Sequence, residues 1–205
     1  MTKILFQGDS ITDCGRSRTD LTDCGPGYPG KVKAYLDLFF PGEYEVINRG
    51  ISGNRTTELA ARWQKDCLDL KPDMLTILIG VNDTWRRYDR DLLTTPETFE
   101  KNYRYLLDSA KQSLPNTKIL LMVPFLLPVR SEWETWREDL DPKKNIVKKL
   151  AIEYGTDLLA LDGLLARMCT KAVPSHWSAD GVHPTDAGHS VIARKWLEVN
   201  HFLNV

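Results

Sequence analysis

The chain has 205 residues, and its 27 lysines and arginines nearly balance its 28 aspartates and glutamates, which gives a formal net charge of -1. Because this balance provides no basic face, it argues against nucleic acid as a partner. No apolar run approaches the ~20 residues that span a membrane, so we expect no membrane partner either. The length indicates one domain, residues 1–205, with a sizeable core.

The N-terminus and the cysteines bear on the cellular compartment. The chain enters an apolar run almost at once, directly after Lys3, which is not the pattern of a signal peptide. We therefore expect a cytoplasmic protein, or a mature form that has lost its leader. The four cysteines show no CxxC spacing and are expected to be reduced thiols. Cys14 and Cys24, which flank one loop, are the two that could pair.

Apolar runs alternate with helical spacing of apolar residues along the whole chain. Five strands are expected, at residues 4–6, 44–48, 73–79, 118–123 and 157–161. The spacing predicts six helices, at 32–40, 59–70, 96–114, 146–154, 164–169 and 185–199. Connecting segments are expected at 13–30, at 49–54, from 80 to beyond 85, and at 124–142.

The strands are continuous apolar runs, which is typical of a parallel sheet covered on both faces. We therefore predict a three-layer α/β/α domain with a five-stranded parallel sheet of the flavodoxin-like order 2-1-3-4-5. In that order the loops after the first and third strands lie beside the switch point, where open α/β sheets bind their ligands.

The segment Gly8-Asp9-Ser10-Ile11-Thr12 follows the first strand. A serine just past the carboxyl end of that strand occupies a ligand-binding position and is a candidate nucleophile. Asp and Ser are also common helix N-caps, and these residues alone favour neither interpretation.

A serine nucleophile needs a base, and of the four histidines His183 has the most suitable surroundings. It lies in Asp180-Gly181-Val182-His183-Pro184, where Asp180 could accept from Nδ1 and leave Nε2 free to take the proton of Ser10. The alternative is a purely structural role, in which Asp-Gly before His-Pro is only a turn. For His189 and His201 a packing or surface role is expected.

The developing oxyanion needs donors from loops at the same end of the sheet. Gly53, after the second strand, could turn its backbone N–H inward. Asn82, after the third strand, carries a side-chain NH2, and the Ser10 amide would be a third donor. Alternatively, Gly53 is an ordinary loop glycine and Asn82 is a turn asparagine, each with a structural role only.

Four segments together resemble the sequence blocks of the SGNH hydrolases, also called GDSL esterases. They occur in the family's order, nearly from end to end of the chain: Gly8-Asp9-Ser10-Ile11-Thr12, Gly50-Ile51-Ser52-Gly53-Asn54, Gly80-Val81-Asn82-Asp83 and Asp180-Gly181-Val182-His183-Pro184. The resemblance implies a Ser10-His183-Asp180 triad with Gly53, Asn82 and the Ser10 amide as oxyanion donors. It implies neither a cofactor nor a metal.

Further stretches are similar to the acetylxylan and acetylated xylo-oligosaccharide esterases, which implies an acetylated sugar as substrate. They include Asp13-Cys14-Gly15-Arg16, the run from Asn82 to Asp89, and Ala187-Gly188-His189; Trp177-Ser178-Ala179 departs by shifting an expected aromatic residue. The charged side chains of Asp13, Arg16 and Arg18 are expected close to Ser10. The expected substrate contacts are Asp9, Asn54, Trp85, Arg86 and Tyr88; alternatively, Trp85 packs under its loop and the arginines are solvated.

Three other interpretations stay open. A phosphoacceptor signalling domain would use Asp9, Asp13 and Asp83, although Asp162 stands where such a domain needs a cation. The six tryptophans would suit a carbohydrate-binding module, although aromatic residues are usually core. Within the enzymes, a lipase or thioesterase acting on longer acyl chains is the alternative. A homo-oligomer is compatible with the sequence.

Overall fold

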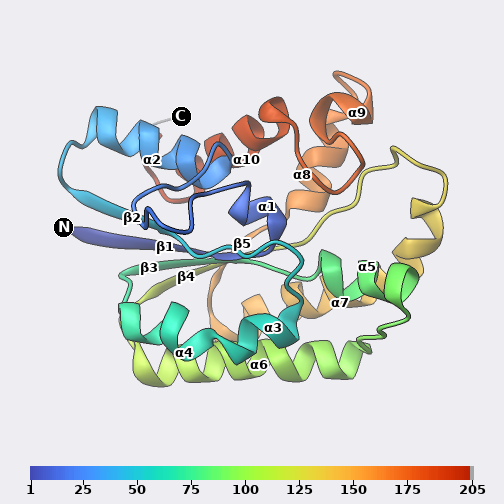
Figure 1. Cartoon of the computed structure of the whole chain (residues 1–205), viewed down its shortest axis with the longest axis horizontal. Coiled ribbons are helices and arrows are strands. Elements are labelled where there is room, and N and C mark those ends of the chain that lie inside the picture. Colours follow the sequence, from blue (N-terminus) through green and yellow to red (C-terminus); the bar gives the residue numbers. More distant parts are fainter. Residues whose placement is uncertain (204–205) are drawn as a thin grey trace.

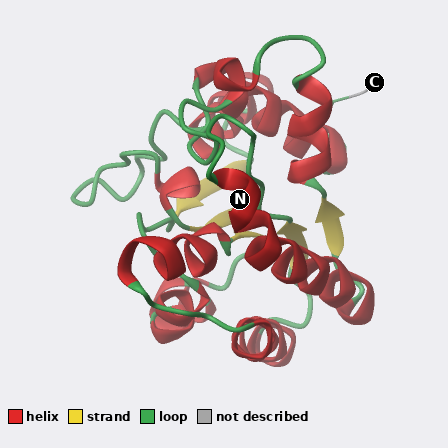
Figure 2. Cartoon of the chain, turned by 90° about the vertical axis from the view of Figure 1, so that its right-hand side faces the viewer, coloured by secondary structure: helices red, strands yellow, loops and turns green. Residues whose placement is uncertain are grey.

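The computed structural model describes residues 1–203. Its centre is a parallel sheet of five strands: β1 (Thr2–Gly8), β2 (Tyr44–Asn48), β3 (Met74–Leu78), β4 (Lys118–Met122) and β5 (Asp157–Leu159). Their order, β2-β1-β3-β4-β5, confirms the predicted order. Figure 1 and the view turned by 90° in Figure 2 show helices on both sides of the sheet, which confirms the three-layer α/β/α architecture.

Alternate strand residues face two separate cores, as β1 illustrates. Ile4 and Phe6 belong to the core above the sheet in Figure 1, and Leu5 belongs to the core below it. The upper helices are α1 (Ser10–Asp13), α2 (Tyr28–Phe39), α8 (Leu161–Met168), α9 (Pro174–Trp177) and α10 (Asp186–Val199). The lower ones are α3 (Thr56–Ala61), α4 (Trp63–Asp66), the 3-10 turn η1 (Leu68–Leu70), α6 (Pro96–Ser113) and α7 (Trp133–Tyr154). This double burial explains the continuous apolar runs.

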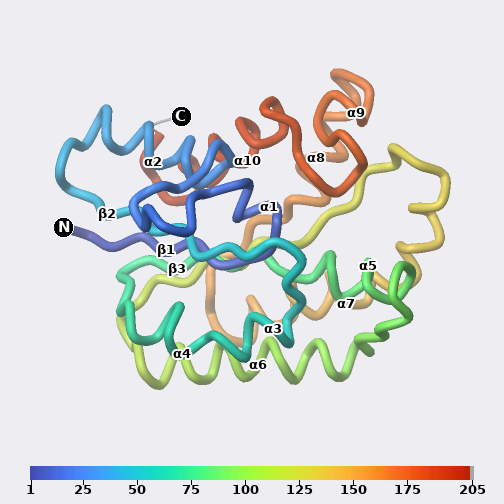
Figure 3. Tube along the Cα trace, viewed as in Figure 1, coloured from blue at the N-terminus to red at the C-terminus, as the bar shows by residue number. Residues whose placement is uncertain are grey.

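The beginning and the end of the chain lie side by side above the sheet. α2 packs against α10, and the blue and red parts of the tube meet there in Figure 3. Trp196 of α10 packs on Phe6 of β1, with ring centroids 5.2 Å apart, and donates from Nε1 to Thr76 Oγ1 of β3 at 2.8 Å. The segment before α10 is thereby fixed over the carboxyl ends of the central strands.

The prediction of a connecting segment over 124–142 is wrong in its second half. α7 begins at Trp133 and runs through Pro142 to Tyr154, whereas only 146–154 was expected to be helical. Pro142 lacks the N–H that an interior helical residue donates. Trp136, Leu140 and Lys143 are buried along the same helix, and this tertiary packing stabilises it across the proline.

Two other helical predictions also need correction. The segment after Gly80 is not a loop, because α5 (Val81–Arg90) starts directly after β3. The single helix expected over 59–70 is divided into α3, α4 and η1, with a break at Arg62 that turns its side chain toward the sheet.

The four cysteines are free thiols, as expected. No helix within residues 1–203 combines the length and the apolar character that crossing a bilayer requires.

Candidate active site

Ser10 is the first residue of α1, immediately beyond β1. The Asp9 side chain caps this short helix, because its Oδ1 accepts from the Ile11 amide at 3.0 Å. The two interpretations of this segment are therefore compatible: Asp9 is the N-cap, and Ser10 lies at the carboxyl edge of the sheet. Gly8 makes the tight exit possible, since a Cβ there would lie only 2.3 Å from both Leu78 O and Thr12 Oγ1.

The structure brings His183 and Asp180 to Ser10 from the other end of the chain. Ser10 Oγ lies 2.9 Å from His183 Nε2, and His183 Nδ1 lies 2.7 Å from Asp180 Oδ2. Asp180 Oδ1 accepts from the amides of Val182 and His183 at 2.9 and 2.7 Å. The carboxylate thus holds both the histidine ring and its backbone, so the Asp-Gly turn and the Ser-His-Asp arrangement are one structure.

The backbone around His183 is fixed by packing as well. Gly181 adopts φ 93°, and a Cβ at that position would lie 2.5 Å from Leu127 O and 2.6 Å from Trp133 Nε1. Trp133 Nε1 donates to the Asp180 carbonyl at 2.5 Å. A glycine is therefore required at position 181 for both conformation and space.

The charges of the pair are mutually stabilising. Burial alone would raise the pKa of Asp180, but the hydrogen bonds from the His183 ring and from the two backbone amides outweigh it and lower the pKa to about 2. The hydrogen bond to Asp180 raises the pKa of His183 above its ordinary value, against the opposing effect of burial. An ionised Asp180 keeps the proton of neutral His183 on Nδ1, and Nε2 can then accept from the Ser10 hydroxyl.

The two other residues expected to donate to the oxyanion lie at the same edge of the sheet. Gly53, with φ 82°, follows β2, and Asn82 is the second residue of α5, so it is held by a helix rather than by the predicted loop. Asn82 Nδ2 donates to the Asn54 carbonyl at 3.1 Å, which joins the two segments. That contact uses one of the two amide hydrogens of Asn82 and leaves the other for a ligand.

The neighbouring Asp83 has a structural position. It is fully buried, and it accepts from the amide and the hydroxyl of Thr56 at 2.9 and 2.7 Å. These bonds connect α5 to the start of α3 beneath the loop that carries Gly53. A buried carboxylate with these partners is not accessible as a phosphoacceptor.

Sequence reasoning missed Arg62, which connects the first strand to the Gly53 segment. Its guanidinium donates to the Gly8 carbonyl at 3.1 Å, to Asn54 Oδ1 at 2.8 Å, to Gln7 Oε1 at 2.9 Å and to the Arg49 carbonyl at 2.8 Å. Residues just before Ser10 and just after Gly53 are thereby held by one planar group. An arginine on an otherwise apolar helical stripe was the available signal.

Asp13 makes a second connection of this kind. Its Oδ2 accepts from the Ser52 amide at 3.0 Å, from Ser52 Oγ at 2.6 Å and from Arg18 Nη2 at 2.7 Å. Arg16 is buried and donates to the Gly50 carbonyl at 3.2 Å. The charges expected to surround a ligand near Ser10 are therefore largely used to fix the loop that carries Gly53.

Trp85 is half-buried in an aromatic cluster that reaches the histidine. Its ring centroid lies 5.9 Å from that of Trp133, 5.4 Å from that of Trp136 and 5.7 Å from that of His183. Tyr88 stacks on Trp136 at 5.0 Å and is 41 % exposed. Trp85 thus both packs under its segment and borders the base, while Tyr88 lies farther along the same cluster.

The other three residues expected to contact the substrate are Asp9, Asn54 and Arg86, and their surroundings differ. The expectation for Asp9 is wrong, because the residue is only 1 % exposed and burial raises its pKa to about 7. Asn54 uses its side-chain oxygen to accept from Arg62. Arg86 lies over the loop that carries Gly53, and its Nη2 would be 3.7 Å from a Cβ built on that glycine.

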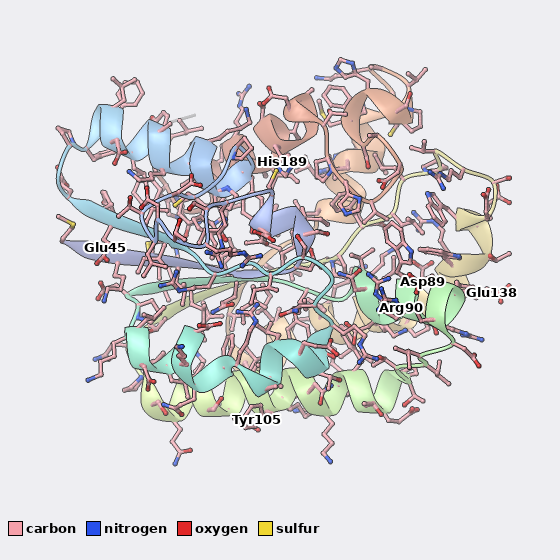
Figure 4. All side chains as sticks on the ribbon, in the orientation of Figure 1. Glu45, Asp89, Arg90, Tyr105, Glu138 and His189 are labelled. Atoms are coloured by element: carbon pink, nitrogen blue, oxygen red, sulfur yellow. The ribbon has the colours of Figure 1, made fainter. Side chains whose placement is uncertain are left out.

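His189, labelled in Figure 4, has the packing role expected of it. The Tyr28 amide donates to its Nδ1 at 3.1 Å, and its Nε2 lies 3.3 Å from Cys14 Sγ. Burial lowers the pKa of His189 to about 4, so the ring is neutral and joins α10 to the segment after α1.

Comparison with known proteins gives consistent matches over nearly the whole chain. A family model described as the GDSL-like lipase/acylhydrolase family matches residues 6–191. An acetylxylan esterase of Geobacillus stearothermophilus is 35 % identical over 202 residues, which cover 95 % of this chain and 92 % of the relative.

Solved structures agree with these sequence matches. The crystal structure of Axe2, an acetylxylan esterase from Geobacillus stearothermophilus, has a TM-score of 0.88 at 34 % identity and covers 97 % of this chain and 93 % of its own. LAE5, an alpha/beta hydrolase enzyme from the metagenome of Lake Arreo, has a TM-score of 0.90 at 32 % identity, with 100 % and 97 % covered. The chain therefore belongs to the GDSL-like lipase/acylhydrolase family.

Proposed function

We propose that this protein is a serine esterase that removes short acyl groups, chiefly acetyl, from carbohydrates. The observation that carries the proposal is the continuous chain of contacts from Ser10 Oγ to His183 Nε2 at 2.9 Å and from His183 Nδ1 to Asp180 Oδ2 at 2.7 Å. Family membership assigns the reaction class, a carboxylic ester hydrolase.

In the first half of the reaction, Ser10 Oγ attacks the ester carbonyl carbon while His183 Nε2 takes the serine proton. The carbonyl oxygen becomes an oxyanion that accepts from the amides of Ser10 and Gly53 and from Asn82 Nδ2. When the carbon–oxygen bond to the alcohol breaks, His183 returns the proton to the departing oxygen, and the acyl group remains on Ser10.

In the second half, water replaces the alcohol. His183 Nε2 takes a proton from water as its oxygen attacks the acyl carbon, and the same donors stabilise the second oxyanion. Collapse breaks the bond to Ser10 Oγ, which regains its proton from His183, and the carboxylic acid leaves. Throughout, Asp180 stays ionised and holds the imidazolium that forms at each attack.

The substrate class is supported by the surroundings of the candidate triad. Trp85 places an aromatic ring 5.7 Å from His183, a suitable surface for the face of a sugar. The hollow that borders Gly53 contains several charged groups, whereas an apolar hollow of about 630 Å³ between α2 and α10 contains no candidate site residue. Acetylated xylan is the substrate named for Axe2, and we extend it to this chain as acetylated sugar.

The test compares nitrophenyl acetate, butyrate and octanoate, and then acetylated xylobiose, with the wild-type protein and Ser10→Ala. We expect kcat/KM to fall steeply with acyl length, acetate to be released from the sugar, and Ser10→Ala to lose several orders of magnitude in kcat with its fold intact. A preference for octanoate would assign the protein as a lipase or thioesterase. Full activity of Ser10→Ala would refute the nucleophile.

Trp85→Ala tests the sugar contact separately. The variant should lose more kcat/KM on acetylated xylobiose than on nitrophenyl acetate, because only the sugar ester presents a pyranose face to the ring. Equal losses on both esters would limit Trp85 to packing in the aromatic cluster.

A further inference from the structure

A polar hollow of about 500 Å³ opens between the loop after β2, the start of α3 and the outer side of α5. We call it the arginine hollow, and its lining includes Gly53, Arg55, Glu58, Arg86, Arg90 and Leu92. Figure 4 labels Arg90 and its neighbour Asp89 on α5. The volume lies within the range typical of small-molecule sites.

The arginine hollow borders a proposed oxyanion donor. The Gly53 backbone forms part of its wall, and Arg86 Nη2 would lie 3.7 Å from a Cβ built on that glycine. The Arg86 guanidinium therefore lies close to the backbone that carries the proposed Gly53 donor. Arg86 is 19 % exposed at its side chain, so it is held in place more firmly than a freely solvated arginine.

Positive charge exceeds negative charge around the arginine hollow. Arg55 binds Glu58 with both Nε and Nη2, and Arg86 binds Asp89 through Nη1 only. Arg90 makes no ion pair with any carboxylate of residues 1–203. Three arginines and one carboxylate, that of Glu58, line the hollow; when Asp89, which pairs with Arg86, is also counted, one positive charge is left without an ion-pair partner in the described part of the chain.

The free hydrogen-bonding groups of the arginine hollow are mostly donors. Both carboxylate oxygens of Glu58 already accept from Arg55, at 2.6 Å for Oε1 and at 2.8 Å from its backbone amide for Oε2. Arg86 Nη2 and the Arg90 guanidinium remain available. Sugar hydroxyls require acceptors as well as donors, whereas a carboxylate requires donors alone.

We infer that the arginine hollow binds a carboxylate carried by the alcohol portion of the ester, and that the unpaired charge of Arg90 provides the preference, while Arg86 adds a hydrogen-bond donor. The inference rests on the proposed esterase function, in which the acyl group is acetyl. An acetyl group carries no charge, so the carboxylate belongs to the alcohol. Among carbohydrates this describes an acetylated oligosaccharide that contains a uronic acid.

The experiment measures kcat/KM for 4-acetoxyphenylacetate and for its methyl ester. These esters share the phenolic leaving group, and a methylene separates it from the carboxylate, so their intrinsic reactivities are similar. The wild-type enzyme should prefer the anionic ester by about tenfold, mainly through KM, because hydrogen bonds to charged groups are the stronger ones. Arg90→Gln should bring the ratio close to one.

Arg87→Gln is the matched control, because Arg87 lies on the same helix and pairs with Asp139 outside the arginine hollow. This control removes the same charge and should keep the tenfold ratio. No preference for the anion in the wild-type enzyme, or an equal fall of the ratio in both variants, would overturn the inference; the second result would assign the preference to the general field of α5.

A binding measurement separates this inference from the esterase proposal. In the Ser10→Ala background, calorimetry should give a lower Kd for 4-hydroxyphenylacetate than for its methyl ester, and Arg90→Gln should remove the difference. This result would support the arginine hollow even if no ester were hydrolysed. Equal Kd values for the two compounds would overturn it even if the esterase proposal held.

Discussion

Replacing Asp180 with asparagine should separate the orientation of the base from the stability of its loop. An asparagine side chain can keep its oxygen on the amides of Val182 and His183, as Asp180 Oδ1 does at 2.9 and 2.7 Å. Its NH2 group then faces His183 Nδ1 and can donate only if that nitrogen is unprotonated. The ring proton moves to Nε2, the atom 2.9 Å from Ser10 Oγ, and the base is blocked.

We therefore expect Asp180→Asn to lower kcat by roughly 10⁴-fold with little change in KM, the size of effect known for the same replacement in a serine protease triad. Asp180→Ala should retain more activity, because a ring without a partner exchanges between tautomers. Steady-state kinetics on nitrophenyl acetate measure both. A kcat for Asp180→Asn within tenfold of wild type would refute the tautomer argument.

The same variant has a predictable effect on stability. The pKa of Asp180 is lowered from 3.8 to about 2, and the side chain is 24 % exposed. At about 1.4 kcal/mol per pKa unit, the ionised carboxylate contributes on the order of 2 kcal/mol to the free energy of unfolding at neutral pH. Because its pKa is lowered by folding, this stabilisation is present above pH ~4 and is lost as the pH falls through about 2.

Urea unfolding at several pH values measures this contribution. The wild-type protein should lose free energy of unfolding relative to Asp180→Asn between about pH 4 and pH 2, so the gap between the two proteins should narrow. A gap that stays constant through this range would show that the ionised carboxylate does not stabilise the fold.

Three other substitutions test separate parts of the structure. Asn82→Ala should lower kcat roughly 10²–10³-fold with little change in KM; a rise in KM at constant kcat would make Asn82 a substrate-binding residue instead. Arg62→Lys cannot reproduce the four contacts to Gln7, Gly8, Arg49 and Asn54, so kcat should fall roughly tenfold or more, and an unchanged kcat would exclude its positioning role. Lys143→Met leaves the buried Asp139 without its closest partner, so the free energy of unfolding measured with urea should fall by about 3 kcal/mol. The double variant Lys143→Met/Asp139→Leu should lose less, because it leaves no unpaired carboxylate; equal losses in the two variants would contradict a paired-charge effect.

The sheet could be predicted because its determinants are local. Each strand is an apolar run of its own, and each is separated from the next by a helical pattern and turn residues. The prediction failed where packing across the molecule decides the outcome. Pro142 interrupts a helical pattern in sequence, yet α7 continues through it because the residues on either side are buried against other elements.

The candidate site shows the same division. Ser10, Asp180 and His183 stand in short motifs, and the structure brings them within hydrogen-bonding distance. The connecting role of Arg62 had only one local signal, an arginine on an otherwise apolar helical stripe, because its acceptors come from β1 and from the loop after β2. The burial of Asp9 had no local signal, because an N-cap side chain that accepts from the Ile11 amide can be either exposed or buried by neighbouring elements.

Ser10 and His183 are 173 residues apart in sequence, and this separation has a consequence for refolding. Contacts between such distant residues form late, since a long segment must first be ordered between them. β1 is the first strand in the chain but has neighbours on both sides in the sheet, so it is complete only after β3 has paired. During refolding from urea, helical circular dichroism should therefore recover before esterase activity, which makes activity a reporter of the last docking step.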